Sequence, residues 1–144
     1  MIRLNISSQK GMRVPQLQIK KLFDGIMKQE SDKSAAGDIN LIFTTDGEIK
    51  KLNRKYRKKE KPTDVLSFKY ENYFGRDGVF GEIYVSTDTA RKQAQEYGHT
   101  LNQEFLRLFC HGLLHLMGYD HNKPLDRKKM KAKESLYLNL PGLI

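Results

Sequence analysis

The stretch His111-Gly112-Leu113-Leu114-His115-Leu116-Met117-Gly118-Tyr119-Asp120-His121 holds three of the four histidines of a 144-residue chain. His111 and His115 are four residues apart, so on a helix they lie on one face, one turn above the other. Gly118 stands where a helix can end through a left-handed residue, and a turn there brings in His121. The spacing predicts a three-histidine metal site with one open position, the style of a catalytic zinc centre.

The same spacing, with glycine at the eighth place, is typical of the metzincin zinc proteases, whose motif is H-E-x-x-H-x-x-G-x-x-H. Gly112 stands where those enzymes carry the glutamate that acts as general base. Without that glutamate, no carboxylate beside the first histidine takes a proton from an attacking water. We therefore expect the metal ligands to be retained and peptidase chemistry to be absent.

The residues before this motif predict that it lies on a central, buried helix. Thr100 or Asn102 can cap this helix at its start. Apolar side chains then occur on nearly all its faces, which is typical of a buried helix: Leu101, Phe105, Leu106, Leu108, Phe109, Leu113, Leu114 and Leu116. Cys110 precedes His111 and points about 100° away from it on a helix. We expect a small buried residue at Cys110 and not a fourth ligand.

Hydrophobic periodicity predicts the remaining elements. Strands are expected at 2–6, 39–43, 65–70 and 79–85, the last two forming a hairpin. Helices are expected at 15–30, from about 46 to 61, from 87 to 97 and from 124 to 138. The order β-α-β-α-β-β-α-α-α predicts an α+β fold with a small mixed β-sheet packed with helices, and a single domain over residues 1–144. His99, after the glycine that ends the third helix, is expected to be a surface residue.

Composition narrows the function classes. The formal net charge is +9, which favours a polyanion such as RNA or DNA, or an anionic membrane surface. No apolar run of about 18 residues is present, so we expect no membrane span. The N-terminus lacks the apolar core of a signal peptide, and the single cysteine cannot form an internal disulfide. We therefore expect a cytoplasmic protein.

Residues 50–61 are strongly basic, and only Glu60 opposes the positive side chains. Charge alone favours a solvated helix face, the usual meaning of such a run. The functional alternative is a face that contacts phosphate groups. The basic residues are Lys50, Lys51, Arg54, Lys55, Arg57, Lys58, Lys59 and Lys61.

Three stretches resemble the YbeY family of bacterial endoribonucleases that mature ribosomal RNA. The first is the histidine motif itself, from His111 to His121. The second is Leu52-Asn53-x-x-Tyr56-Arg57 followed by Pro62-Thr63-Asp64-Val65-Leu66-Ser67-Phe68. The third is Gly81-Glu82-Ile83-Tyr84-Val85-Ser86, in which Glu82 replaces the aspartate more common in the family.

The resemblance implies a cytoplasmic, metal-dependent, single-strand-specific endoribonuclease. Such an enzyme acts in maturation of the 16S rRNA 3′ end, in ribosome assembly and in ribosome quality control. The resemblance also implies one Zn²⁺ per chain on the three histidines and a functionally important arginine at Arg57. It suggests a small-subunit ribosomal protein and an assembly GTPase as partners, and no membrane.

Roles can be assigned to particular residues on this basis. His111, His115 and His121 are predicted to bind the metal, with His111 and Arg57 as the catalytic residues. Arg57 suits bidentate contact with the scissile phosphate, and the residues Arg54, Lys58 and Lys61 are predicted to join it in binding substrate. Three further residues either support the ligands and face the cleft or form local turns: Asp64, Ser67 and Asp120.

Two questions stay open in the sequence. The nucleophile is either a hydroxide on the metal or the 2′-hydroxyl of the RNA. The alternatives to a ribonuclease are a non-catalytic RNA-binding assembly factor with a structural zinc and, disfavoured by Gly112, a metallopeptidase.

Overall fold

The structure, a computed structural model, describes residues 2–9, 11–30, 36–57, 63–70, 79–141 and 143. Within these residues the elements follow the predicted order, and the α+β class is confirmed. The strands are β1 (Ile2–Ser8), β2 (Gly37–Thr44), β3 (Val65–Lys69) and β4 (Val79–Ser86). The helices are α1 (Gln16–Glu30), α2 (Asp46–Arg57), α3 (Thr87–Tyr97), α4 (Leu101–Leu116) and α5 (Pro124–Leu138).

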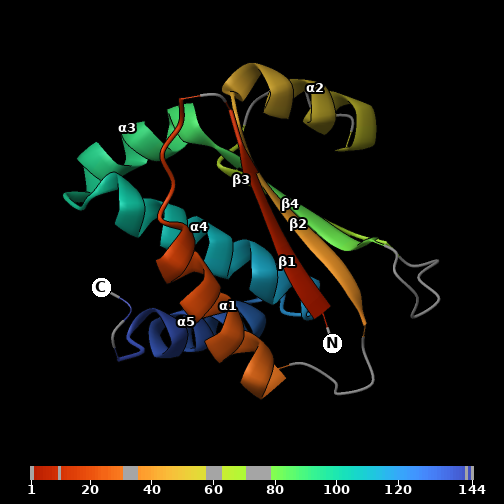
Figure 1. The fold of residues 1–144 in the computed structure, drawn as a ribbon. Helices are drawn as coiled ribbons and strands as arrows, with labels where there is room; N and C mark the ends of the chain where they lie inside the picture. The colour runs from red at the N-terminus through yellow and green to blue at the C-terminus, as the bar shows by residue number, and fades with distance from the viewer. Residues whose placement is uncertain are drawn as a thin grey trace.

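The strands form one mixed sheet in the order β1-β2-β4-β3. β1, β2 and β4 are parallel, and β3 pairs antiparallel with β4, as predicted for the hairpin. Parallel neighbours need a crossover connection, and α1 supplies the one between β1 and β2. Figure 1 shows α1, α4 and α5 together on one side of the sheet, with α2 across one end. β3 stands last in the strand order and is therefore an edge strand of the sheet.

The core lies between the sheet and α4. Alternate residues of β2 point into it, and Leu41 and Phe43 are almost wholly buried. Phe43 meets Phe105 of α4 edge to face, with ring centroids 4.8 Å apart. Ten of the sixteen residues of α4 are buried, which confirms the prediction of a central helix. The metal motif is thus carried by the most enclosed helix among the described residues.

Side chains at the helix ends explain where α4 begins and ends. The hydroxyl of Thr100 accepts from the backbone N–H of Gln103, and the Gln103 side chain accepts from the Thr100 N–H, a complete capping box. After the helix, Gly118 has φ 102°, a left-handed conformation that favours glycine. The predicted cap and the predicted turn are both confirmed.

His99 is partly exposed, at 27% of its side chain, and it makes a contact that the sequence did not predict. Its Nε2 lies 2.7 Å from the carboxylate of Glu104, a side chain that is 0% exposed. The chain turns sharply at Gly98, where φ is 70°, and this turn directs His99 back against the start of α4. A buried carboxylate needs polar partners, and His99 is one of them.

Contacts at the start of α3 hold the basic helix α2 in place. Ser86 caps α3 by accepting from the backbone N–H of Thr89. Asp46, the first residue of α2, accepts hydrogen bonds from the hydroxyls of Ser86 and Thr89. In return, the carboxylate of Asp88 accepts from the backbone N–H of Asp46 at 3.0 Å. These contacts attach the start of α2 to the end of β4.

Gly112 lets α4 approach the sheet closely. A Cβ atom at this position would lie 2.8 Å from Ile83 Cγ2, 3.0 Å from Ser67 Oγ and 3.2 Å from Val65 Cγ2. The Ser67 hydroxyl donates to the Gly112 carbonyl at 3.0 Å and joins β3 to the helix. A side chain at this position would require the side chains of Ile83, Ser67 or Val65 to shift. The packing therefore explains why a metzincin-type glutamate is absent here.

Gly112→Ala should lower the free energy of unfolding by about 1–3 kcal/mol, the usual cost of overpacking a core. This loss should appear although alanine has the higher helix propensity. Urea unfolding at equilibrium measures it. The control is Gly47→Ala in α2, where the new Cβ would meet only Thr45 Oγ1, at 3.8 Å, and stability should stay equal or rise. Equal losses in both variants would contradict the close packing.

Candidate metal centre

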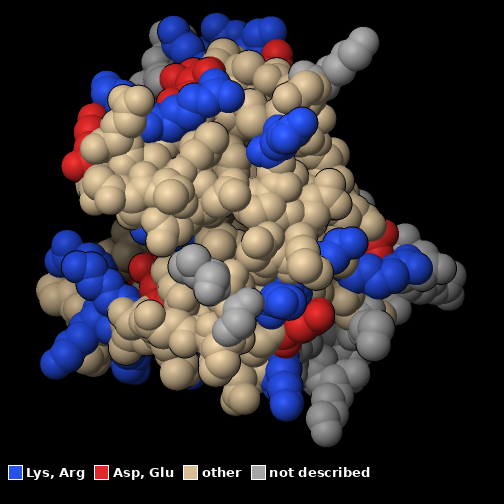
Figure 2. Space-filling model, turned by 60° about the vertical axis from the view of Figure 1, so that its left-hand side comes forward, with Lys and Arg blue, Asp and Glu red and all other residues tan. Residues whose placement is uncertain are grey.

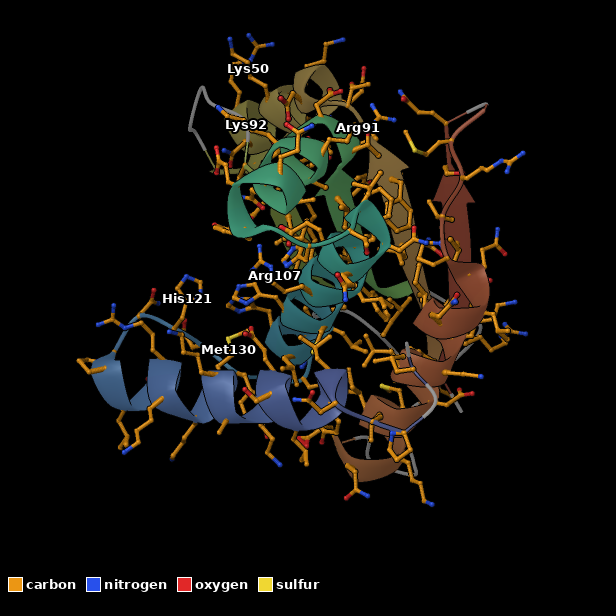
Figure 3. All side chains as sticks on the ribbon, turned by 90° about the vertical axis from the view of Figure 1, so that its left-hand side faces the viewer. Lys50, Arg91, Lys92, Arg107, His121 and Met130 are labelled. Carbon is orange, nitrogen blue, oxygen red and sulfur yellow. The ribbon has the colours of Figure 1, made fainter. Side chains whose placement is uncertain are left out.

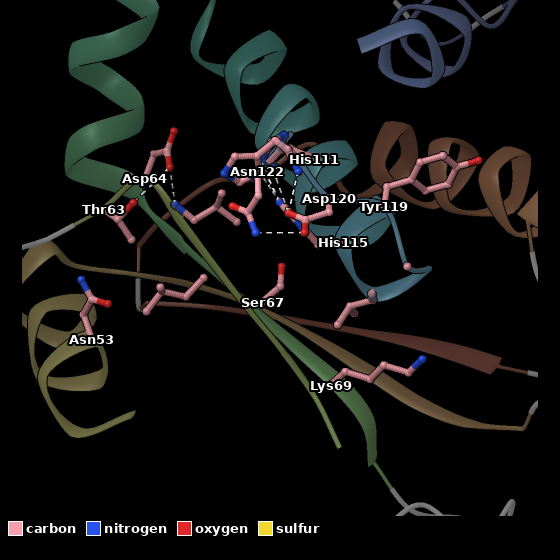
Figure 4. A pocket seen from close by; sticks show the side chains of 15 residues that line it. Asn53, Thr63, Asp64, Ser67, Lys69, His111, His115, Tyr119, Asp120 and Asn122 are labelled. Atoms are coloured by element: carbon pink, nitrogen blue, oxygen red, sulfur yellow. Dashed lines mark hydrogen bonds between the residues drawn. The ribbon is translucent and has the colours of Figure 1, made fainter. Parts of the chain in front are cut away.

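Helix α4 and the loop after it bring three imidazole rings together. His111 and His115 lie on one face of α4, and His121 follows five residues after the helix ends (Figure 4). His115 Nε2 lies 3.2 Å from His111 Nε2 and 3.0 Å from His121 Nδ1. One ring nitrogen from each histidine lies within 4.8 Å of the other two. The convergence predicted from the motif is therefore present.

The spacing of these nitrogens suits a metal ion. In a tetrahedral zinc site with bonds of about 2.05 Å, two ligand nitrogens are about 3.3 Å apart. The two short separations, 3.2 Å and 3.0 Å, are within a few tenths of an ångström of that value. Imidazole nitrogen is also a preferred ligand type for zinc and its transition-metal neighbours. The three histidines could therefore hold a metal ion with little rearrangement.

The surroundings of His115 favour its neutral form, which is the form that can bind a metal. Burial lowers the pKa of the His115 imidazole, and the nearby charges of His111 and His121 lower it further. A histidine must be neutral to bind a metal, because the bond uses the lone pair of a ring nitrogen. His115 is therefore held in the form that can act as a ligand.

Asp120 shapes the loop that carries the third histidine. Its Oδ1 accepts from the backbone N–H groups of His121, at 2.6 Å, and Asn122, at 3.2 Å. Its Oδ2 accepts from the Asn122 side chain at 3.0 Å. These are the bonds of a local turn. Two roles were considered for Asp120, support of a histidine ring or a local turn. Its hydrogen bonds are those of a local turn.

Tyr119 fixes the same loop from the other side. It points away from the histidines toward α1 (Figure 4), where its hydroxyl donates to Glu30 Oε1 at 2.6 Å. Tyr137 of α5 donates to Glu30 Oε2 at 2.5 Å, and Lys133 Nζ lies 3.3 Å from the same oxygen. One carboxylate thus ties together α1, the histidine loop and α5.

Glu30 is ionised because its partners outweigh its burial. Burial alone would raise the pKa of the carboxyl group. The hydrogen bonds from Tyr119, Tyr137 and Lys133, with the charge of Lys133, lower the pKa below its ordinary value. The same carboxylate raises the pKa of both tyrosines, after burial as the larger cause. The network is therefore a charged one at neutral pH.

The histidines lie in an open cleft of about 800 Å³ between α4, the end of α2 and the edge strand β3. Asn53 of α2, which is 3% exposed, lines it together with Ser67 and Lys69 of β3. Asp64 also lines the cleft. Asp64 Oδ1 accepts from the backbone N–H of Val65 at 2.8 Å, so it serves a local turn as well.

The comparisons with known proteins agree on one family. A family model described as Endoribonuclease YbeY matches residues 4–141. The chain belongs to the YbeY endoribonuclease family. The resemblance drawn from the sequence motifs is thus confirmed, and with it the assignment to an enzyme class, the endoribonucleases.

Individual relatives support the same conclusion. A protein of Nautilia profundicola named Endoribonuclease YbeY is 51% identical, over 73% of this chain and 75% of its own length. A protein of the same name from Bacillus licheniformis is 39% identical, over 97% of this chain and 95% of its own. A solution structure from Thermotoga maritima is 33% identical with a TM-score of 0.65, over 96% of this chain and 87% of that one. The likeness therefore extends over nearly the whole fold.

Several residues predicted to bind RNA in this YbeY-family chain have no described side chain. Arg57 ends α2, and its side chain lies outside the described part of the structure, as do Lys58 and Lys61 entirely. Arg54 is described and exposed. Figure 2 shows Lys and Arg side chains gathered at the top of the molecule, where α2 and α3 lie, and at its lower left. None of the helices in the described ranges has the length and apolarity to cross a bilayer.

Cys110 stays a thiol beside the cluster. Burial raises its pKa to about 12, and the charge of Glu134 contributes to the rise. A thiol must lose its proton to bind a metal. The expectation of a small buried residue at Cys110 is confirmed.

Sequence reasoning missed two groups of polar contacts around the YbeY motif. Arg107, one turn before His111 on α4 (Figure 3), contacts the buried Glu104 through Nη2 at 2.6 Å and Nε at 2.8 Å. It also donates to Gln93 Oε1 at 3.3 Å, and Gln93 donates to Asp64 at 3.4 Å. The second group is the contact of His111 with Glu134 of α5. The only sequence signal was the spacing of Arg107, His111 and His115 at intervals of four.

Glu30→Gln should lower the free energy of unfolding at pH 7 by about 1–3 kcal/mol, because hydrogen bonds to a charged group are lost. The pKa of Glu30 is lower in the folded chain than in the unfolded one, so its stabilisation is present above the unfolded pKa and is lost as the pH falls through the folded value. The difference from wild type should therefore shrink between about pH 5 and pH 3. Urea unfolding across that range measures it.

Glu96→Gln serves as the control, since Glu96 is an exposed carboxylate on α3. It should change stability little at any of these pH values. A Glu30→Gln deficit that stays constant with pH would contradict a role for the charge.

Proposed function

We propose that this chain is a zinc-dependent endoribonuclease that cleaves single-stranded RNA in maturation of the 16S rRNA 3′ end. One observation supports this most directly: three imidazole nitrogens converge in an open cleft of a chain that belongs to an endoribonuclease family. Residues 1–144 would act as one catalytic domain in the cytoplasm. From the family resemblance we also propose roles in ribosome assembly and quality control, with a small-subunit ribosomal protein and an assembly GTPase as partners.

His111 Nε2, His115 Nε2 and His121 Nδ1 would hold the ion, because these atoms face one another. When bound, zinc supplies a Lewis acid that polarises a phosphodiester oxygen. His121 is exposed and the other two are half-buried, so the cluster is open to a substrate from the cleft. An open position beside three protein ligands is the arrangement of catalytic zinc sites.

The RNA backbone would be held by basic side chains around the cleft. Lys69 lines the cleft itself, and α2, which contributes Asn53 to the cleft, carries exposed basic residues. Lys and Arg contacts with phosphates supply most of the sequence-independent affinity of nucleic-acid-binding proteins. The α2 residues concerned are Lys50, Lys51, Arg54 and Lys55, and Lys58 and Lys61 would extend the same surface.

Arg57 is the cation we propose for the scissile phosphate. It follows Asn53 by four residues, so both positions lie on one face of α2, and Asn53 lines the cleft. A guanidinium can contact two phosphate oxygens at once and stabilise charge that develops during cleavage.

The two other functions considered differ in what the metal does. A structural zinc in an assembly factor would be required for folding, whereas α4 is already anchored by ten buried residues and a capping box. A metallopeptidase needs a general base beside the first ligand, and this chain has Gly112 there, where a Cβ atom would lie 2.8 Å from Ile83 Cγ2. Both observations favour the ribonuclease.

The first test compares wild type and His111→Ala for bound metal and for cleavage of a single-stranded RNA carrying the 16S 3′ end. We expect about one zinc per wild-type chain by mass spectrometry, and loss of both metal and cleavage in the variant. Chelation of wild type should abolish cleavage while the circular dichroism spectrum stays that of a folded protein. Zinc without cleavage, on free RNA and on ribosomes alike, would support the assembly factor instead.

The second test is Arg57→Ala. Cleavage should fall by about 100-fold, as when one charge-stabilising donor is removed from an active site. Arg57→Lys should recover only part of the rate, because an ammonium group cannot make the bidentate contact. Zinc content and unfolding midpoint should not change. Arg91→Ala, at an exposed position on α3, is the control and should cleave at the wild-type rate.

A further inference from the structure

The ring of His111 lies between a carboxylate and the ring of His115. Glu134 Oε1, from α5, lies 2.6 Å from His111 Nδ1. On the opposite side of the ring, Nε2 lies 3.2 Å from His115 Nε2. The side chains of His111 and Glu134 are 27% and 19% exposed, so water screens their contact only partly.

The chemistry of the two groups assigns the proton. An ionised carboxylate can only accept hydrogen bonds, so the hydrogen between the two atoms belongs to His111 Nδ1. A neutral imidazole then carries its free lone pair on Nε2, the atom that faces His115 and His121. A carboxylate behind a histidine fixes the tautomer and the ring orientation and makes the other nitrogen a stronger ligand.

The position of Glu134 on α5 makes this contact a fixed one. Met130 and Tyr137 lie four residues before and three residues after it, on the same face of the helix, and are 2% and 1% exposed. Figure 3 shows Met130 directed from α5 toward α4. Glu134 is thus a charged residue within an otherwise packed stripe of α5, aimed at the first histidine of the motif.

We propose that Glu134 is a positioning residue that prepares His111 to bind the metal through Nε2. This inference rests on the proposed metal site and deepens it: the site then requires α5 as well as α4 and its loop. The orientation of His111 therefore depends on a residue outside the eleven-residue motif.

Three variants separate hydrogen bonding from charge. Glu134→Gln keeps an acceptor oxygen at the same reach without the charge. Glu134→Asp keeps the charge but is one methylene too short to reach Nδ1. Glu134→Ala removes both. Zinc affinity, measured by competition with a chromophoric chelator, should fall 10- to 100-fold for alanine and less for aspartate, and should stay closest to wild type for glutamine. The absorption spectrum of the Co²⁺-loaded protein should change in the same order.

Stability of the metal-free proteins shows whether the effect is merely structural. Urea unfolding without metal should give similar midpoints for wild type and the glutamine and aspartate variants. Glu96→Ala, which removes an exposed carboxylate of α3, should bind zinc as wild type does. Should the alanine variant fail to fold, the order of glutamine and aspartate decides the question.

Two results would overturn the inference. One is wild-type zinc affinity in Glu134→Ala, and the other is tighter binding by aspartate than by glutamine, which would reveal a general effect of charge. RNA cleavage plays no part in this test. A wild-type protein that binds zinc and cleaves no RNA would therefore refute the proposed function alone. A wild-type protein that binds no zinc would refute both.

Discussion

The close approach of α4 to the sheet at Gly112 is the contact on which the site depends. A side chain there would meet atoms of Ile83, Ser67 and Val65 at 2.8 to 3.2 Å. Because the helix lies so near, the Ser67 hydroxyl reaches the Gly112 carbonyl, and β3 forms one wall of the cleft. This contact fixes how α4 and its side chains are oriented relative to the sheet. His111 and His115 therefore line the cleft beside the edge strand β3.

Carboxylates partly or wholly removed from water hold the parts around α4 together. Glu104 joins His99 and Arg107, Glu30 joins Tyr119 and Tyr137, and Glu134 contacts His111. Burying a carboxylate is costly unless it is paired and hydrogen-bonded, so each arrangement excludes others in which the partners are apart. In a chain with a net charge of +9, these acidic groups serve internal structure, whereas Figure 2 shows groups of Lys and Arg side chains at the surface.

Local patterns explain what the sequence could predict. Strand alternation, helical spacing, the Thr100 cap and the Gly118 turn all depend on residues a few positions apart, and they yielded the element order and the histidine cluster. The supporting contacts span longer distances along the chain: 23 residues from His111 to Glu134, and 89 from Glu30 to Tyr119. No periodicity carries such information. The contact between His99 and Glu104 spans only five residues, but it depends on the burial of the Glu104 side chain, which the local pattern does not indicate.

The packing and hydrogen bonds of the protein position the three histidines. His111 and His115 take their positions from a helix with a packed core and a complete cap. His121 lies on a loop held on one side by Tyr119 against Glu30, and shaped by Asp120, which binds the backbone of His121 itself. Ordering a loop on binding consumes part of the binding free energy, and an ordered loop avoids that cost. Metal affinity in this chain should therefore be sensitive to residues that never touch the metal, on α1 and α5 as much as on α4. The short motif supplies the donor atoms, and the tertiary fold supplies their orientation.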